Sequence, residues 1–170
     1  VMREAIMAVA YARASRDGSP TEEQLRNAAH FLSVTFKYEF IYDPVARFKE
    51  SFAQTLDEFI TAGIFLRRKL ETDDGLQDVL MMPSRGTAHH TMEMLHFIME
   101  PWLEAYWLLA MGLHEFLEPD GTEMSQREFM RKLQDMAIKR YHVSDIQCAE
   151  AGSATTFGHA LEAYASLGYV

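Results

Sequence analysis

The chain has 170 residues, of which 48% are hydrophobic and 24% are charged, a composition typical of one soluble globular domain. Its net charge of −9 at pH 7 argues against nucleic acid as the main partner and against simple adsorption to anionic lipid, since both require a basic surface. The single cysteine, Cys148, excludes an internal disulfide framework and a thiolate zinc site.

The charge is distributed unevenly along the chain. Residues 1–85 carry 11 bases and 13 acids, a net charge of −2, whereas residues 86–170 carry 5 bases and 12 acids, a net charge of −7. No basic residue lies between Arg85 and Arg127. This pattern fits either a solvated acidic face or a surface that docks on a basic partner or sister domain.

The first 36 residues predict two helices. Residues 1–16 are rich in alanine and methionine, and Gly18 is a plausible helix stop. Ser19 is predicted to cap the second helix, with Pro20 in its first position and Glu22 completing a capping box. That helix should run to about Phe36. Its apolar spacing predicts a buried face made of Leu25, Ala29, Leu32 and Phe36.

A third helix and a hairpin are expected next. Residues 38–42 (YEFIY) are aromatic and β-prone, and Asp43-Pro44 then favours a new helix start. The helix should end at Gly63, and its apolar stripe is predicted from Val45, Phe48, Phe52, Leu56 and Phe59. Residues 63–70 and 75–82 suit short strands around an Asp74-Gly75 turn signal.

The first half therefore has the outline of a winged helix, which raises the question of DNA binding. The helix after Pro44 would face the groove. It carries Arg47 and Lys49 against three acids, a net charge of −1, and the basic residues of the hairpin are matched by acids as well. This balance argues against a DNA reader.

The stretch Thr87–Phe116 holds four histidines, four glutamates and no Lys or Arg, so it must be weighed as a metal site. Glu93 and His96 have the Glu-x-x-His spacing of di-iron helical bundles, but such a site needs two of these motifs. His89-His90 and His114-Glu115 are adjacent pairs, and adjacent side chains diverge by about 100° on a helix. We therefore expect no bound metal here.

The same stretch must be weighed as a membrane span. Met94–Leu113 has the length that crosses a bilayer, but it contains Glu100, Glu104 and Pro101. Each acid near the bilayer centre costs about 2–3 kcal/mol on insertion scales, and two such penalties roughly cancel the whole apolar gain. A core helix that is buried nearly all round is favoured, and an apolar face pressed on another domain is the alternative. Pro101 either kinks one long helix or starts a second.

Two further helices are predicted in the last third. Ser125 and Glu128 have capping-box spacing and open a helix with Phe129, Leu133, Met136 and Arg140 along one side. Ser153 is predicted to cap the last helix, which carries Phe157, Leu161 and Tyr164 and ends at Gly168. The fold class expected from the whole pattern is mainly α, with six or seven helices and one small hairpin. It should form a single helical domain over residues 1–170, with sub-lobes 1–85 and 86–170.

Catalytic signals are sparse. Cys148 has no obvious base near it in sequence, no Gly-x-Ser-x-Gly elbow is present, and the nine glycines form no phosphate-binding loop. No catalytic, cofactor-binding or metal residue is therefore assigned.

Three segments together nevertheless resemble a known family. Residues 38–65 (YEFIYDPVARFKESFAQTLDEFITAGIF), 99–107 (MEPWLEAYW) and 150–170 (EAGSATTFGHALEAYASLGYV) are similar, in order and spacing, to the C-terminal region of glycerol-3-phosphate and dihydroxyacetone-phosphate acyltransferases. The match extends over nearly the whole chain. Its individual motifs are weak, so the order of the motifs carries the resemblance.

The resemblance implies a role in acyl transfer from acyl-CoA to a glycerol phosphate, with a His-x-x-x-x-Asp pair as general base and its carboxylate. None of the seven histidines is followed five residues later by Asp; the residues at those positions are Thr35, Met94, Leu95, Pro101, Pro119, Gln147 and Tyr164. The phosphate-binding Phe-Pro-Glu-Gly-x-Arg-Ser motif of the family is also missing. The chain is therefore expected to be the non-catalytic helical domain that follows the catalytic domain.

The resemblance also implies partners and a location. The upstream catalytic domain of the same polypeptide would be the partner, and that parent would bind acyl-CoA and glycerol 3-phosphate and associate with a membrane. This segment would lie on its cytoplasmic side. The alternatives are the same region of a dihydroxyacetone-phosphate acyltransferase, or a stand-alone helical or winged-helix interaction module without enzyme activity.

Overall fold

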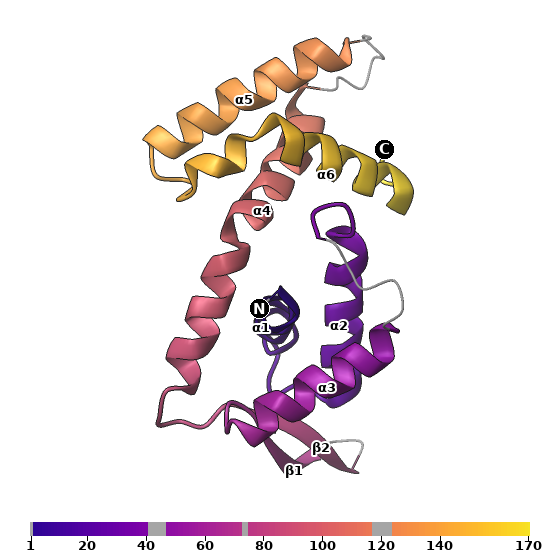
Figure 1. Cartoon of the computed structure of the whole chain (residues 1–170), viewed down its shortest axis with the longest axis vertical. Helices are drawn as coiled ribbons and strands as arrows, with labels where there is room; N and C mark the ends of the chain where they lie inside the picture. The colour runs from indigo at the N-terminus through magenta and orange to yellow at the C-terminus, as the bar shows by residue number, and fades with distance from the viewer. Residues whose placement is uncertain (1, 41–46, 73–74, 117–123) are drawn as a thin grey trace. The chain divides into compact units, whose positions relative to one another are not determined.

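The computed structural model of the chain describes residues 2–40, 47–72, 75–116 and 124–170. Six α-helices and one two-stranded hairpin in these residues confirm the mainly α fold (Figure 1). The elements, in chain order, are α1 (Met2–Ala14), α2 (Glu22–Thr35), α3 (Phe48–Thr61), β1 (Leu66–Thr72), β2 (Gly75–Met81), α4 (Ala88–Phe116), α5 (Gln126–His142), the 3₁₀ helix η1 (Ala149–Gly152) and α6 (Ala154–Leu167).

Close Cα neighbours group the chain into two compact units. Unit 1 comprises Val1–Val34 and Phe40–Met99, and unit 2 comprises Thr35–Glu39 and Glu100–Val170. The chain thus enters unit 2 briefly after α2 and enters it again within α4, just before Pro101. That residues 1–170 act as one domain with sub-lobes 1–85 and 86–170 stays a prediction.

Unit 1 combines three helices with a small sheet in the element order of a winged helix. Strands β1 and β2 pair antiparallel, from Leu66 opposite Met81 to Thr72 opposite Gly75. The expected Asp74-Gly75 turn falls partly outside the described residues, and Gly75 itself begins β2 with a φ of +107°. A β-bridge between Thr21 and Val79 brings the start of α2 to the outer side of β2.

The start of α2 differs from the sequence prediction. Thr21, and not Ser19, is the capping residue: its hydroxyl accepts a hydrogen bond from the Gln24 amide at 3.2 Å, and the Gln24 side chain accepts one from the Thr21 amide at 2.8 Å. This is a complete capping box two residues later than expected. Pro20 lies before the helix because its carbonyl accepts a hydrogen bond from the Leu80 amide of β2 at 2.8 Å.

Helix α3 carries the predicted apolar stripe and the predicted glycine stop. Phe52, Leu56 and Phe59 are buried, whereas Val45 and the Asp43-Pro44 start lie outside the described residues. Gly63 has a φ of +70°, and the Gly63 and Ile64 amides donate to the carbonyls of Ile60 and Phe59. This is a Schellman motif, which ends a helix by satisfying its last carbonyls. Of the β-prone residues 38–42, the described Tyr38–Phe40 form turns and no strand.

The core of unit 1 centres on the rings of Tyr11 and Phe65. The two rings stack with centroids 4.7 Å apart, and Phe59 contacts Phe65 at 5.2 Å. The Tyr11 hydroxyl donates to the Leu80 carbonyl at 3.5 Å and accepts from the Met82 amide at 3.3 Å, and burial raises its pKa. One tyrosine thus joins α1 to the hairpin.

Helix α4 is continuous through Pro101, which settles the alternatives left open by the sequence. The prediction that it is buried nearly all round is wrong, because Met94, Phe97 and Trp107 expose 55%, 62% and 43% of their surface. The exposed residues of the first half of α4 agree better with the alternative prediction, an apolar face that packs against another domain. Among the described helices, none combines the length and hydrophobicity needed to cross a bilayer.

In unit 2, α5 and α6 begin at the predicted caps. The Ser125 hydroxyl accepts from the Glu128 amide at 3.2 Å, and the Ser153 hydroxyl accepts from the Thr156 amide at 3.4 Å. Gly168 ends α6 with a φ of +78°. The buried face of α6 consists of Phe157, Ala160 and Ala163, so the half-buried Leu161 and Tyr164 lie at its edge.

Candidate functional site

A pocket of about 340 Å³ opens in unit 2 between the end of α4 and α5. Helix α4 contributes Glu115 and Phe116, and α5 contributes Lys132, Asp135, Met136, Lys139 and Arg140. The volume lies within the range of small-molecule sites. No site residue was predicted from the sequence, and the pocket depends on the way the fold brings α4 and α5 together.

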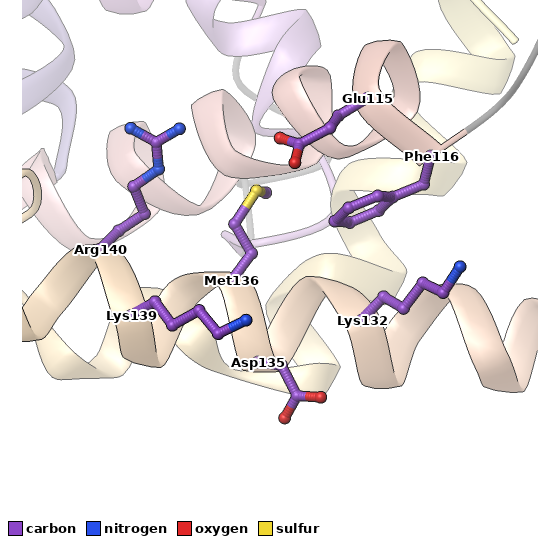
Figure 2. A pocket seen from close by; sticks show the side chains of 7 residues that line it. All are labelled: Glu115, Phe116, Lys132, Asp135, Met136, Lys139 and Arg140. Atoms are coloured by element: carbon purple, nitrogen blue, oxygen red, sulfur yellow. The ribbon is translucent and has the colours of Figure 1, made fainter.

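The local geometry of α5 explains why these side chains converge. Lys132, Met136 and Arg140 are successive i, i+4 neighbours, so they lie along one helix face. Figure 2 shows Met136 and Arg140 pointing from α5 toward α4, whereas the carboxylate of Asp135 points away from α4. The pocket therefore has an apolar floor, made by Met136 and the Phe116 ring, with charged groups around it.

The balance of charge in the pocket is positive. Three of its lining side chains are cations and two are carboxylates. All 5 basic residues of the otherwise acidic stretch 86–170 lie on α5, which carries only Glu128 and Asp135 against them. Helix α5 thus has a net charge of +3, and the rest of residues 86–170 has a net charge of −10. Within the described residues of the C-terminal half, the charge of α5 is the one that favours an anion.

Two of the three cations already have partners. Arg140 contacts Asp145 at 2.7 Å, and Lys132 lies 3.8 Å from Glu128 with its ammonium 5.8 Å from the centre of the Phe116 ring. Lys139 makes no ion pair with a described residue. Its side chain is exposed, so its ammonium is available to a ligand.

A second polar cluster joins the Thr35–Glu39 segment to α4 and α6 within unit 2. The side chain of Glu39 is only 6% exposed, and its carboxylate contacts His159 Nδ1 at 3.2 Å and accepts a hydrogen bond from the Tyr106 hydroxyl at 3.3 Å. The Tyr164 hydroxyl donates to the Tyr106 carbonyl at 2.9 Å. Glu39 and His159 are 120 residues apart in the chain, and no local pattern predicts their contact.

The residues weighed as metal ligands are not gathered into a site. His89, His90, Glu93 and the pair His114-Glu115 are exposed along α4, and His96 is half-buried. Across the part of the chain that the structure describes, no three His, Cys, Asp or Glu residues are placed to hold a metal ion.

Cys148 is a buried thiol in a negative environment. Burial raises its pKa to about 11, and the charges of Glu104, Glu100 and Glu150 add to the shift. Glu104 is itself buried, and its two carboxylate oxygens accept hydrogen bonds from the Gln147 and Cys148 amides at 2.6 and 2.9 Å. Because the reactive form of cysteine is the thiolate, this arrangement disfavours a nucleophilic role for Cys148.

The comparison with known families bears on the whole chain. Residues 1–170 match the family described as the glycerol-3-phosphate acyltransferase C-terminal region. The chain belongs to this family. No individual curated protein matches it. The family confirms the resemblance seen in the sequence and links this C-terminal region to acyltransferases and lipid biosynthesis.

Proposed function

We propose that the chain is the non-catalytic C-terminal helical domain of a glycerol-3-phosphate acyltransferase that transfers an acyl group from acyl-CoA to glycerol 3-phosphate. The observation that carries the proposal is the family match, which spans residues 1–170. The sequence supports the non-catalytic role, because none of its seven histidines has Asp five residues later. The general base and its carboxylate would therefore belong to the upstream catalytic domain.

This chain does contain a contact between a carboxylate and a histidine, Glu39 and His159, but the pair lies outside the pocket. Glu39 and His159 come from segments 120 residues apart, and the pocket of this unit is lined by other residues. The contact from Tyr106 to the same carboxylate fits a role in holding the Thr35–Glu39 segment in place.

The decisive test is an acyl-transfer assay on this chain with acyl-CoA and glycerol 3-phosphate. We expect no turnover above the uncatalysed background, whereas a full-length glycerol-3-phosphate acyltransferase is active under the same conditions. Turnover that is lost in His159→Gln would place a general base within this chain and overturn the proposal.

The upstream catalytic domain of the same polypeptide is the proposed partner of α4. His90, Met94 and Phe97 have helical i, i+4, i+7 spacing on its first half and are all exposed. The absence of Lys and Arg between Arg85 and Arg127 suits a basic surface around this apolar face. The parent would bind both substrates and associate with the membrane, with this segment on the cytoplasmic side.

Docking is tested by titrating a separately produced catalytic domain with this chain. Replacing Phe97 with serine should raise the dissociation constant about tenfold or more, as loss of an aromatic anchor does. Leu76→Ser is the matched control, because Leu76 is an exposed apolar residue of the hairpin in the same unit. Equal effects of the two variants, or no association at low salt, would contradict this use of α4.

Two other functions can be distinguished from the proposed one by experiment. Dihydroxyacetone phosphate is the alternative acceptor, and competition between the two acceptors in the parent enzyme separates them.

The winged-helix order of unit 1 favours a stand-alone interaction module as the second candidate. Helix α3 has a net charge of −2, from Lys49 against Glu50, Asp57 and Glu58, so such a module would bind protein and not DNA. Retention of DNA in a filter-binding assay at low salt would contradict that view.

A further inference from the structure

We propose that the pocket between α4 and α5 is a binding site for a phosphate monoester that carries a short apolar chain. This site lies outside the acyl-transfer chemistry assigned to the parent protein. The inference does not rest on the proposed function, because the pocket and its charges belong to this chain alone.

The charges favour an anion at Lys139, which is exposed and has no described ion-pair partner. Arg140 and Lys132 line the same pocket, where they are paired with Asp145 at 2.7 Å and with Glu128 at 3.8 Å. Glu115 is the carboxylate that faces the pocket, since Asp135 points away from it (Figure 2). A dianionic phosphate gains more from this set than a singly charged carboxylate does, and Lys binds phosphate as a point charge.

The apolar floor and the volume of the pocket indicate the apolar part of the ligand and its size. Met136 and the Phe116 ring offer apolar surface between the charged groups. At roughly 30 Å³ for each water-sized volume, a pocket of about 340 Å³ has room for on the order of eleven water-sized groups. That is the size of hexyl phosphate, whose alkyl chain would cover the floor while its phosphate meets the cations.

A purely structural explanation of the cations predicts a different behaviour. Lys139 and Arg140 lie in the last turn of α5, where positive charge stabilises the helix macrodipole. In that case their removal would lower stability without any effect specific to a phosphate ligand. Measuring affinity and thermal stability on the same variants separates the two explanations.

The experiment titrates the 170-residue chain with hexyl phosphate, followed by amide chemical shifts in NMR spectra. We expect saturable shifts centred on Phe116 and Met136. Inorganic phosphate, glycerol 3-phosphate and the neutral hexyl glucoside should each bind about tenfold more weakly, since each lacks either the chain or the charge. If inorganic phosphate binds as well as hexyl phosphate, or if hexyl glucoside does, the proposed ligand class is wrong.

Charge variants of opposite sign make the test sharper. Lys139→Gln should raise the dissociation constant for hexyl phosphate about tenfold, as loss of a charge-assisted contact does. Glu115→Gln should lower it several-fold, because it removes the carboxylate that faces the phosphate. Arg131→Gln is the matched control: it deletes the same charge from α5 at an exposed position outside the pocket. Equal weakening by Lys139→Gln and Arg131→Gln, or unchanged affinity in Lys139→Gln with a lower melting temperature, would overturn the site.

Discussion

Replacing Glu104 with alanine is expected to destabilise unit 2 by about 2–3 kcal/mol, because a buried donor left without an acceptor costs roughly 1–3 kcal/mol. The variant removes the acceptor of two amides, that of the buried Cys148 at 2.9 Å and that of the exposed Gln147 at 2.6 Å. Urea unfolding measures the loss of free energy. Hydrogen exchange at the two amides should show that protection falls there first.

The control for this variant is Glu162→Ala, which removes an exposed glutamate from α6 in the same unit. Its effect should stay within about 0.5 kcal/mol, as for most surface substitutions. If Glu104→Ala and Glu162→Ala cost the same, Glu104 does not hold the segment that joins α5 to η1.

The reactivity of Cys148 provides a second readout of the Glu104 carboxylate. With a thiol pKa of about 11, the thiolate fraction at pH 8 is about one in a thousand, so alkylation of the folded protein should be very slow. Glu104→Gln removes one of the negative charges that raise this pKa, so alkylation should become faster at the same pH. The stability that the raised pKa contributes is present below pH 9, the usual thiol value, and is lost as the pH rises through about 11.

Local signals in the sequence were sufficient to predict most of the helices. The stripe of α3, the caps at Ser125 and Ser153 and the glycine stops at Gly63 and Gly168 depend on residues within one or two helical turns. Their side-chain and backbone partners are near in sequence, so spacing alone predicts them.

The sequence predictions were wrong where contacts with distant segments override the local preferences of the chain. Ser19 and Pro20 have the local pattern of a helix start, but pairing with β2 draws this segment into the sheet. The helix then begins after Thr21, which provides the cap instead. In α4, the run of apolar residues predicted complete burial. The exposed Phe97 shows that composition predicts the hydrophobicity of a helix but not how much of its apolar surface is buried within this chain.

The candidate site was only partly accessible from the sequence. The spacing of Lys132, Met136 and Arg140 on one face of α5 can be read from the chain, as can the concentration of basic residues in this helix. What the sequence does not contain is the position of Glu115 and Phe116 beside them, because α4 and α5 are separate helices brought together by the fold. The same holds for Glu104, whose partners lie 43 and 44 residues away.

Replacing Phe65 with alanine should destabilise unit 1 by about 3–5 kcal/mol, the usual cost of deleting a fully buried phenyl ring. Phe65 is completely buried between the Tyr11 ring at 4.7 Å and the Phe59 ring at 5.2 Å, where α3 passes into β1. The cavity removes contacts from α1 and α3 at the same time, so the surrounding rings cannot relax toward one another without moving a helix. The free energy of unfolding, measured with urea and tyrosine fluorescence, gives the size of the effect.

Two further variants show whether the ring itself carries this stability. Phe65→Leu keeps most of the volume and should cost about 1–2 kcal/mol, since swaps between apolar residues of similar size are tolerated best. Leu76→Ala removes a hydrophobic side chain that is 75% exposed on β2 and should be nearly neutral. A cost for Phe65→Ala no larger than that for Leu76→Ala would mean that the hairpin is not anchored through Phe65. The contact of Tyr11 with Leu80 and Met82 would then be the main link between α1 and the sheet.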